Sequence, residues 1–392
     1  MNNMINTTEA LTSVIDRAKK VPQVGLDTEF VWEQTYYPSL GVIQIALSGD
    51  EAFLIDAPAI EDMAPFGELL ANPEVTKIFH DAQQDLTILR RATGAFPQNV
   101  FDTQCAAGFV GFSSSISLSA LLGDAIGVQL PKTETRTDWL KRPLTDRQVE
   151  YALDDVLHLH ALHDQLLSKA QEREHEIWLA EELAKYNDPD LYEDNEIQEV
   201  FRRVKGSGRL EAKKLVILRE LASWRENEAR RRNRPKSWVL SDETLISISR
   251  NSPRTTEDFN TIKPISKKEI QRYGEALLRE VKKGLSIPND KRPKVTAHYK
   301  DEESLGARVD FVLAYMKGKS MSAGIDPTLV ATRAEITALV REGPNSNVND
   351  HRLLRGWRRE FLGEDIIKLL AGKLSVRLDI NTGLPQPTTK TK

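Results

Sequence analysis

Acidic side chains at short spacings are the residues of this chain with the clearest chemistry. Asp27 and Glu29 stand two apart in QVGLDTEFV at 23–31, a segment whose apolar residues predict a β-strand. Alternate residues of a strand point to the same face, so both carboxylates are expected on one side. Paired acids near a core need a compensating charge, which a bound divalent cation supplies. The alternative is an edge strand with both acids in water.

A third acid falls at the start of a predicted helix. Asp85 lies in the first turns of a helix expected over 82–92, directly after a strand expected at 75–80. Helices in that position project side chains over strand ends. An acid there also complements the helix dipole, so a capping role is the alternative.

A tyrosine and an aspartate share one face of a later helix. Tyr151 and Asp155 are spaced i, i+4 within a helical pattern at 147–170, which makes their side chains neighbours. Asp154 is almost as well placed, and spacing does not choose between the two aspartates. The alternative is an exposed polar face with an ordinary tyrosine.

Taken together, these segments resemble a known family. DTEF on a strand is followed by HDAQQDL at the start of a helix and by YALDD on a late helix. Over residues 1 to about 170 the chain resembles the DEDD superfamily of 3′→5′ exonucleases, in the branch with a tyrosine in the third motif. Within that branch it is most similar to the ribonuclease D family. The supporting residues are Thr35, Tyr36, Tyr37, Pro38, Gln44, Phe101, Asp102, Thr103, Asp138, Trp139, Arg142, Pro143 and Leu144.

The resemblance implies a role for each motif residue. Asp27, Glu29, Asp85 and Asp155 would coordinate two divalent cations, Mg²⁺ or Mn²⁺, which clamp the attacking and leaving oxygens of an in-line displacement. Tyr151 would orient the attacking water, because a phenol with a pKa of about 10 is mostly protonated at neutral pH. The implied reaction removes nucleoside 5′-monophosphates one at a time from RNA 3′ ends. The implied substrates are transfer RNA precursors with 3′ extensions.

Four further residues near the motifs are candidates for substrate contacts. Phe30 and Trp139 have rings that could stack on terminal bases. His80 and Arg142 could contact phosphate or sugar. Each of the four also has a packing alternative.

Charge divides the chain into an acidic and a basic half. Residues 1–190 hold 14 lysines and arginines against 30 acids, and residues 191–392 hold 40 against 28. Carboxylates gathered in one domain can hold metals, and a basic partner domain can hold a polyanion. The densest basic run is Arg230, Arg231, Arg232, Arg234 and Lys236, followed by Trp238. Five cations in seven residues are more than a helix end needs, which favours phosphate contacts by Arg230, Arg231 and Arg232.

The order of the predicted elements indicates the fold class. Strands come first and then alternate with helices, which predicts a mixed sheet flanked by helices. The resemblance implies that this is a ribonuclease H-like exonuclease domain followed by two all-α, HRDC-type helical domains. The expected divisions are an exonuclease domain at 1–175, a linker at 176–208, an HRDC domain at 209–290, a second HRDC-like domain at 300–380 and a disordered tail at 382–392.

Composition excludes several classes of protein. Apolar residues make up 40% and charged residues 29%, which is ordinary for a globular chain and excludes disorder throughout. Cys105 is the single cysteine, so no disulfide can form within the chain. No apolar run reaches the roughly 18 residues of a membrane span, and the N-terminus lacks the pattern of a secretory signal. We therefore expect a cytoplasmic protein with no membrane association. Since one chain supplies a closed set of ligands, we also expect a monomer with no obligatory protein partner.

Two other functions remain open from the sequence. The same four acids would serve a DNA 3′→5′ exonuclease of repair or proofreading type, since only contacts to the 2′-hydroxyl distinguish RNA. The chain could also be a nucleic-acid-binding scaffold whose acid cluster is vestigial. The intact set of five motif residues argues against this last reading.

Overall fold

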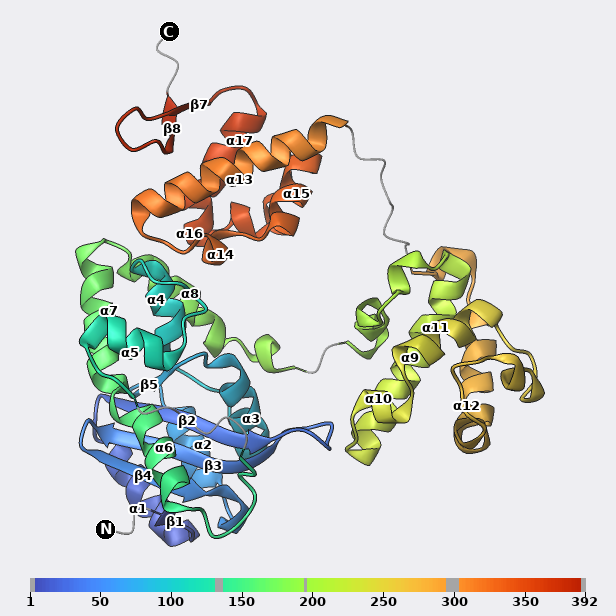
Figure 1. Cartoon of the computed structure of the whole chain (residues 1–392), viewed down its shortest axis with the longest axis horizontal. Helices are drawn as coiled ribbons and strands as arrows, with labels where there is room; N and C mark the ends of the chain where they lie inside the picture. Colours follow the sequence, from blue (N-terminus) through green and yellow to red (C-terminus); the bar gives the residue numbers. More distant parts are fainter. Residues whose placement is uncertain (1–3, 131–136, 194–195, 294–302, 389–392) are drawn as a thin grey trace. The chain divides into compact units, whose positions relative to one another are not determined.

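The computed structural model describes residues 4–130, 137–193, 196–293 and 303–388. Their contacts form two compact units, whose helices and strands Figure 1 labels. The first unit comprises Met1–Phe30, Leu40–Tyr192 and Lys300–Lys392, and the second comprises Val31–Ser39 and Glu193–Tyr299.

A mixed six-stranded sheet forms the centre of the first unit. Its order is β1-β4-β3-β2-β5-β6, with β3 antiparallel to β4 and β5 parallel to both β2 and β6. The expected mixed sheet is confirmed. The strands are β1 (Met4–Ile5), β2 (Gln23–Val31), β3 (Ser39–Ser48), β4 (Glu51–Asp56), β5 (Thr76–Phe79) and β6 (Val100–Asp102).

The central strands are apolar enough to bury both of their faces. Residues 42–47 of β3 are all buried, and in β2 Val24 and Leu26 are fully buried. Strands covered on both faces read as continuous apolar runs, which explains why the sequence locates them. The acids of β2 therefore lie beside a core.

Helices cover this sheet and bring the later motif to it (Figure 1). The pattern at 147–170 predicts one helix, but the structure has two, which meet at His158. The helices are α1 (Thr8–Ala18), α2 (Ala64–Leu70), α3 (Gln83–Thr93), α4 (Thr103–Phe109), α5 (Leu118–Ile126), α6 (Asp146–Leu157), α7 (Leu159–Glu172) and α8 (Glu176–Leu183).

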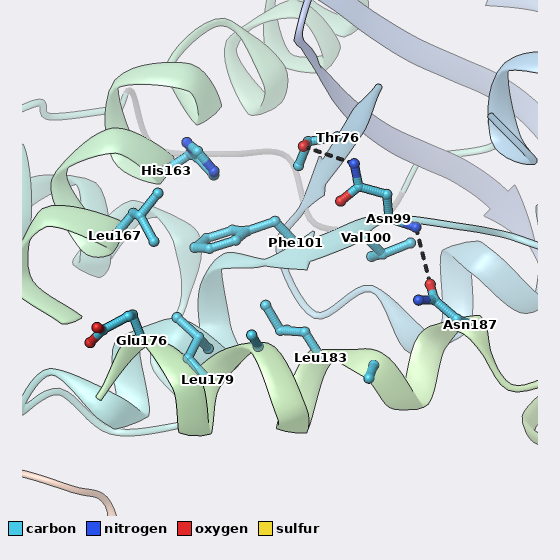
Figure 2. Close-up of a pocket in the computed structure, with 12 residues that line it drawn as sticks. Thr76, Asn99, Val100, Phe101, His163, Leu167, Glu176, Leu179, Leu183 and Asn187 are labelled. Carbon is cyan, nitrogen blue, oxygen red and sulfur yellow. Dashed lines mark hydrogen bonds between the residues drawn. The ribbon is translucent and has the colours of Figure 1, made fainter. Parts of the chain in front are cut away.

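A pocket lies along the edge of the sheet, between β6 and helices α7 and α8 (Figure 2). Its middle is apolar, with Phe101 and Leu183 among the lining residues. At one end the Asn99 backbone N–H donates to the Asn187 side chain at 3.0 Å. None of the predicted site residues lines this pocket.

The expected linker at 176–208 contains ordered structure. It begins with α8 and continues through short 3₁₀ turns. Leu179, Leu183 and Tyr186 are buried in the core of the first unit, so apolar side chains anchor a stretch whose composition is polar. Because the residues between them are polar, the composition alone does not show that this stretch packs against the core.

The C-terminal helices pack against α8 within the first unit. The Arg358 guanidinium donates to the Glu182 carboxylate at 2.6 Å, and the Trp357 indole donates to the same carboxylate at 3.0 Å. Phe109 of α4 contacts Trp357 edge to face, at 5.0 Å between ring centroids. The helices are α13 (Glu303–Ala323), α14 (Pro327–Val330), α15 (Arg333–Glu342), α16 (Gly356–Arg358) and α17 (Glu364–Leu370).

The end of the chain differs from the expected disordered tail. Strand β7 (Ser375–Leu378) pairs antiparallel with β8 (Pro385–Thr388). The turn between them is held by Asp379, whose carboxylate accepts from the Thr382 backbone N–H at 2.8 Å. Residues 389–392 of the expected tail lie outside the described residues.

The second unit is helical around its own core. Helix α9 ends with Arg230, Arg231 and Arg232 of the basic run, and Leu218 and Leu221 of that helix are fully buried. The helices are α9 (Ala212–Arg232), α10 (Lys236–Val239), α11 (Asp242–Asn251) and α12 (Lys267–Ser286). Over the described parts of both units, no helix is both long and apolar enough to cross a bilayer.

Candidate active site

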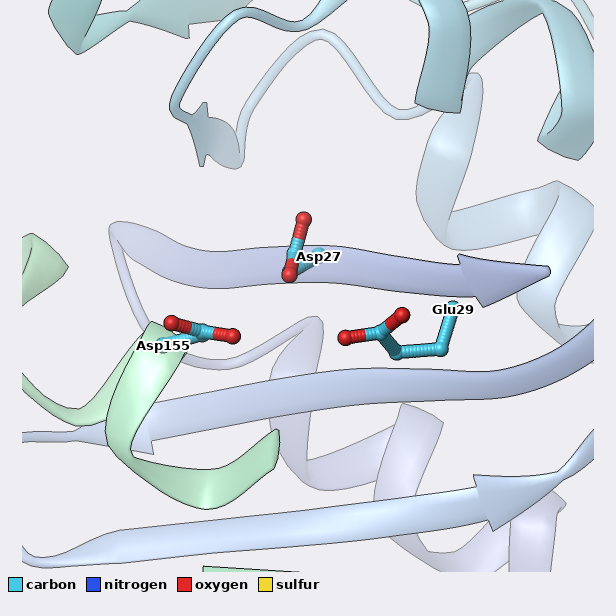
Figure 3. Close-up of side chains that lie close together, drawn as sticks. All are labelled: Asp27, Glu29 and Asp155. Carbon is cyan, nitrogen blue, oxygen red and sulfur yellow. The ribbon is translucent and has the colours of Figure 1, made fainter. Parts of the chain in front are cut away.

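Carboxylates from two elements form one acidic cluster. Asp27 and Glu29 lie on β2 and Asp155 lies on α6, and Figure 3 shows the three side chains close together. One carboxylate oxygen from each lies within 4.8 Å of the others. The i, i+2 spacing places the first two on one face of the strand, and α6 brings the third to them.

The structure distinguishes the two neighbouring aspartates of α6. Asp155 belongs to the cluster, and its carboxylate accepts a hydrogen bond from the Tyr151 hydroxyl one turn earlier. Asp154 is outside the cluster; its pKa is raised by partial burial and by the charge of Glu150. Consecutive helical residues point about 100° apart, so only one of the pair faces β2.

Asp85 approaches the cluster from α3. Its side chain is buried, and its carboxylate accepts a hydrogen bond from the Thr28 hydroxyl. Its charge also contributes to raising the pKa values of Asp27 and Glu29. It is not one of the three residues whose oxygens lie within 4.8 Å of one another. Asp85 thus borders the cluster and acts on it electrostatically.

Burial and mutual repulsion raise the pKa values of these acids. Burial, followed by the charges of Asp85, Asp155 and Glu29, raises the pKa of Asp27 well above its ordinary value. Burial and the charges of Asp155 and Asp85 raise the pKa of Glu29 to about 8. Burial also raises the pKa of Asp85 to about 7 and that of Asp155 to about 6. A divalent cation would compensate this repulsion through oxygen ligands, so the residues present fit a metal site.

Family models match both parts of the chain. The model described as "3'-5' exonuclease" matches residues 2–171, and the model described as "HRDC domain" matches residues 214–281. The exonuclease match covers every member of the acidic cluster.

Relatives match nearly the whole chain. Ribonuclease D of Desulfotalea psychrophila is 42% identical over 365 residues, which cover 92% of this chain and 96% of that protein. Ribonuclease D of Pseudomonas paraeruginosa is 34% identical, over 89% of this chain and 92% of that protein. The chain belongs to the ribonuclease D family.

A solved structure agrees with this assignment. The crystal structure of Escherichia coli RNase D, described as an exoribonuclease involved in structured RNA processing, matches with a TM-score of 0.84 and 31% identity. The match covers 94% of this chain and 98% of the other. Membership in the ribonuclease D family confirms the expected enzyme class, a 3′→5′ exoribonuclease of a metal-dependent family, and the expected fold class.

The raised pKa values predict how the metal-free protein responds to pH. In the unfolded chain these acids ionise near pH 4, whereas in the folded protein Glu29 ionises only near pH 8. Between those values the unfolded state releases protons that the folded state retains, so stability falls as pH rises. In EDTA we expect the midpoint of thermal unfolding to drop by about 10 °C from pH 5 to pH 8, and Mg²⁺ or Mn²⁺ to restore it.

A matched variant separates the acidic cluster from other titrating groups. Glu29→Gln removes one of the repelling charges, so its unfolding midpoint in EDTA should fall less steeply with pH than that of the wild type. Lys77, whose pKa burial lowers to about 7, titrates equally in both proteins and cancels in the comparison. Equal slopes for the two proteins would contradict this electrostatic account.

Three of the four predicted substrate contacts have partners within the protein. Both ring nitrogens of His80 are hydrogen bonded within the protein, to the Thr103 hydroxyl at 2.9 Å and the Ile116 carbonyl at 3.0 Å. Trp139 is only 6% exposed, and its ring lies 6.1 Å from that of Tyr151. His80 is half-buried and Trp139 is buried, and the RNA contacts expected of both residues stay predictions.

Arg142, the third of these residues, is held by hydrogen bonds within the protein. Its Nε and one terminal nitrogen donate to the Asp56 carboxylate at 2.9 and 2.6 Å. Its remaining N–H groups donate to the carbonyls of Trp139, Lys141 and Gly41. All five donors of the guanidinium are thus satisfied internally, and they attach the Trp139 segment to the sheet.

This arrangement predicts a stability defect for a conservative change. Arg142→Lys keeps the charge, but an ammonium group cannot form all five hydrogen bonds that the guanidinium donates to Asp56 and to three carbonyls. We expect a loss of about 2 kcal/mol in the free energy of unfolding, measured by denaturant titration. The salt dependence of RNA binding should not change. A weaker salt dependence with normal stability would instead restore the phosphate-contact role.

The basic run at the end of α9 is largely engaged in ion pairs. Arg230 lies 3.6 Å from the Glu226 carboxylate, and Arg231 and Arg232 both pair with Glu228. Arg231 remains the most open of the three, with 66% of its side chain exposed. The phosphate contacts expected of this run stay a prediction.

Sequence reasoning gave no role to Asp102, which organises the turn before Asp85. One oxygen of this buried carboxylate accepts from the backbone N–H groups of Asp81 and Gln104, and the other accepts from Ala82 and from the Tyr186 hydroxyl. Asp81 has a left-handed φ of 61°, so the carboxylate stabilises a sharp turn into α3. Asp102 lies in the FDT motif that supports the ribonuclease D resemblance, but its partners are known only from the fold.

Proposed function

We propose that the chain is a metal-dependent 3′→5′ exoribonuclease that releases nucleoside 5′-monophosphates one at a time. The observation that carries this proposal is the convergence of Asp27, Glu29 and Asp155 with the Tyr151 hydroxyl inside the exonuclease domain. Mg²⁺ or Mn²⁺, as two ions held by these acids and Asp85, would supply the positive charge that phosphodiester hydrolysis needs at its reacting oxygens.

The side chains have distinct tasks in this reaction. Asp27, Glu29 and Asp155 provide the carboxylate oxygens that hold cations, and Thr28 keeps Asp85 beside them through a hydrogen bond. Burial, followed by the charges of Asp155 and Glu29, raises the pKa of Tyr151 far above 10. The phenol therefore stays protonated and orients the attacking water without acting as a base.

The proposed substrates are transfer RNA precursors with single-stranded 3′ extensions. The similar Escherichia coli protein is described as acting in structured RNA processing, which supports a structured RNA with a free 3′ end. Phe30, which is half-buried, would stack on the terminal base, and Arg230, Arg231 and Arg232 would contact phosphates. We further propose that the protein works as a monomer in the cytoplasm.

We also propose that the functional divisions of the chain are those given by its sequence. The exonuclease domain would occupy 1–175 and the first HRDC domain 209–290, with a second HRDC-like part at 300–380. The exonuclease match at 2–171 and the HRDC match at 214–281 support the first two. The first carries the chemistry, and the helical parts would hold the body of the RNA.

Matched oligomers test the nature of the substrate. RNA and DNA of the same sequence, each with a free 3′ end, are incubated with the protein and Mg²⁺. The proposal predicts faster shortening of RNA, with nucleoside 5′-monophosphates as the product. Faster shortening of DNA would favour the repair-type exonuclease, and binding without any metal-dependent cleavage would favour a scaffold.

A further inference from the structure

Two of the six tryptophans lie open to solvent, and both belong to the second unit. Trp32 is 52% exposed and Trp238 is 58% exposed, whereas Trp139 and Trp357 are buried. One exposed apolar side chain is ordinary on a protein surface. Two exposed indoles beside clustered cations combine the two kinds of group that bind unpaired nucleotides.

Hydrogen bonds hold the Trp32 segment against the end of α9. The side-chain oxygen of Asn233 accepts from the backbone N–H groups of Tyr36 and Tyr37, both at 3.1 Å. The Trp32 indole N–H donates to the Tyr36 carbonyl at 3.2 Å. Asn233 ends α9 in a left-handed conformation, with φ of 46°, which turns the chain toward Arg234. Trp32 is thus held in place while about half of the residue stays exposed.

The cations that follow Asn233 lie against aromatic rings. The Arg234 guanidinium lies 5.7 Å from the Trp238 ring centroid, and the Lys236 ammonium lies 6.0 Å from that of Tyr36. Arg234 has no ion pair among the described residues, and Lys236 lies 3.4 Å from the Glu226 carboxylate. Arg234, Lys236 and Trp238 are all exposed.

The charge of this surface favours a polyanion. The stretch from Glu226 to Lys236 carries five cations against two carboxylates. Its acids are already paired with Arg231, Arg232 and Lys236. A positive surface attracts the phosphate backbone, and a flat indole stacks on any base that is not already paired. Duplex RNA offers the phosphates but hides the base faces.

We propose that Trp32, Trp238, Arg234 and Lys236 form a stacking surface for single-stranded RNA. This inference rests on the proposed exoribonuclease function and specifies how the substrate is held. The two indoles stack on unpaired bases, and the two cations contact the adjoining phosphates. Trp32 directly follows β2 and stands three residues after Glu29 in the sequence. It binds without regard to sequence, since every base has a stacking face.

Binding in EDTA tests this surface without cleavage of the RNA. We would titrate a fluorescein-labelled single-stranded oligouridine and a duplex of equal length against the wild type, Trp32→Ala, Trp238→Ala and the double variant. Each single substitution should weaken binding of the single strand by about tenfold, and the double variant by about a hundredfold. Binding of the duplex should change by less than twofold. Trp238→Phe, which keeps a stacking ring, should retain most of the affinity.

Two controls separate stacking from charge and from misfolding. Phe311→Ala removes an exposed aromatic ring from α13, 49% exposed, and should bind both RNAs as the wild type does. The Trp variants should keep the salt dependence of binding, whereas Arg234→Ala with Lys236→Ala should reduce its logarithmic slope by about 1.4.

The outcomes distinguish this inference from the proposed function. Wild-type affinity for the single strand in the double Trp variant would overturn the stacking surface, as would an equal loss for single strand and duplex. Cleavage is measured separately with wild-type protein in Mg²⁺. Failure to cleave RNA, combined with tryptophan-dependent binding, would overturn the exoribonuclease and leave the surface standing.

Discussion

Asp155→Asn should reduce the rate of RNA cleavage by about a thousandfold, whereas Asp154→Asn should leave it within about twofold of the wild type. The two residues are adjacent on α6, and only Asp155 shares the acidic cluster with Asp27 and Glu29. The amide that replaces Asp155 keeps the shape of the side chain but loses the charge that would hold a cation. Initial rates on a 5′-labelled RNA oligomer with saturating Mg²⁺ give the comparison.

Thermal unfolding of these variants distinguishes a loss of cleavage from a loss of folding. The charge of Asp155 raises the pKa values of Asp27 and Glu29, so its removal relieves repulsion in the metal-free protein. In EDTA at pH 8, Asp155→Asn should unfold at a higher temperature than the wild type, and Mg²⁺ should stabilise it less. Normal cleavage by Asp155→Asn, or a thousandfold loss in Asp154→Asn, would contradict the assignment of the cluster.

Tyr151→Phe should lower kcat by about a hundredfold while leaving metal binding intact. Its hydroxyl donates to Asp155, and burial and neighbouring carboxylates raise its pKa so far that it stays protonated over the working range of pH. The change removes a hydrogen-bond donor from the site without removing a carboxylate. Turnover at saturating RNA measures the effect on kcat, and the rise in unfolding temperature with Mn²⁺ measures metal binding.

The outcome for Tyr151→Phe separates two roles of the phenol. Reduced kcat with an unchanged response to Mn²⁺ is expected of a group that orients water. Unchanged kcat would contradict that role. A reduced response to Mn²⁺ would show instead that Tyr151 acts by holding Asp155 in position for the metal.

The elements that carry the site could be predicted because their sequence patterns are local. Strand β2 reads as an apolar segment interrupted by Asp27 and Glu29, and α6 shows a helical stripe. The i, i+2 and i, i+4 spacings then set which side chains share a face. Spacing alone does not choose Asp155 over Asp154; the family resemblance implies Asp155, and the structure shows that Asp155 is the one in the cluster.

The internal hydrogen bonds of Arg142 and His80 could not be predicted because their partners are distant in sequence. A guanidinium or an imidazole is a candidate for binding phosphate by its residue type alone. The sequence does not show whether its nitrogens already form hydrogen bonds within the protein. The Asp56 carboxylate and the Gly41 carbonyl accept hydrogen bonds from Arg142, and the Ile116 carbonyl is hydrogen bonded to the His80 ring. Residue type thus identifies candidates, whereas the tertiary contacts decide which of them remain available.

The packing of the C-terminal helices could not be predicted either, because it also depends on partners that are distant in sequence. Charged side chains are usually exposed, yet Arg358 is buried and donates to Glu182 of α8. A charge in the interior is tolerated only with a partner, and that partner lies far back in the chain. The grouping of these helices with the exonuclease part in one unit depends on such pairs.

The most direct test of the exoribonuclease function is cleavage of a 5′-labelled transfer RNA precursor with a short single-stranded 3′ extension. The RNA is incubated with the full chain in Mg²⁺, in Mn²⁺ and in EDTA, and Asp27→Asn serves as the control for contaminating nuclease. The account predicts a ladder of 3′-shortened products that needs metal and disappears in the variant. RNA that stays intact in both metals, or a ladder that persists in EDTA or in Asp27→Asn, would contradict it.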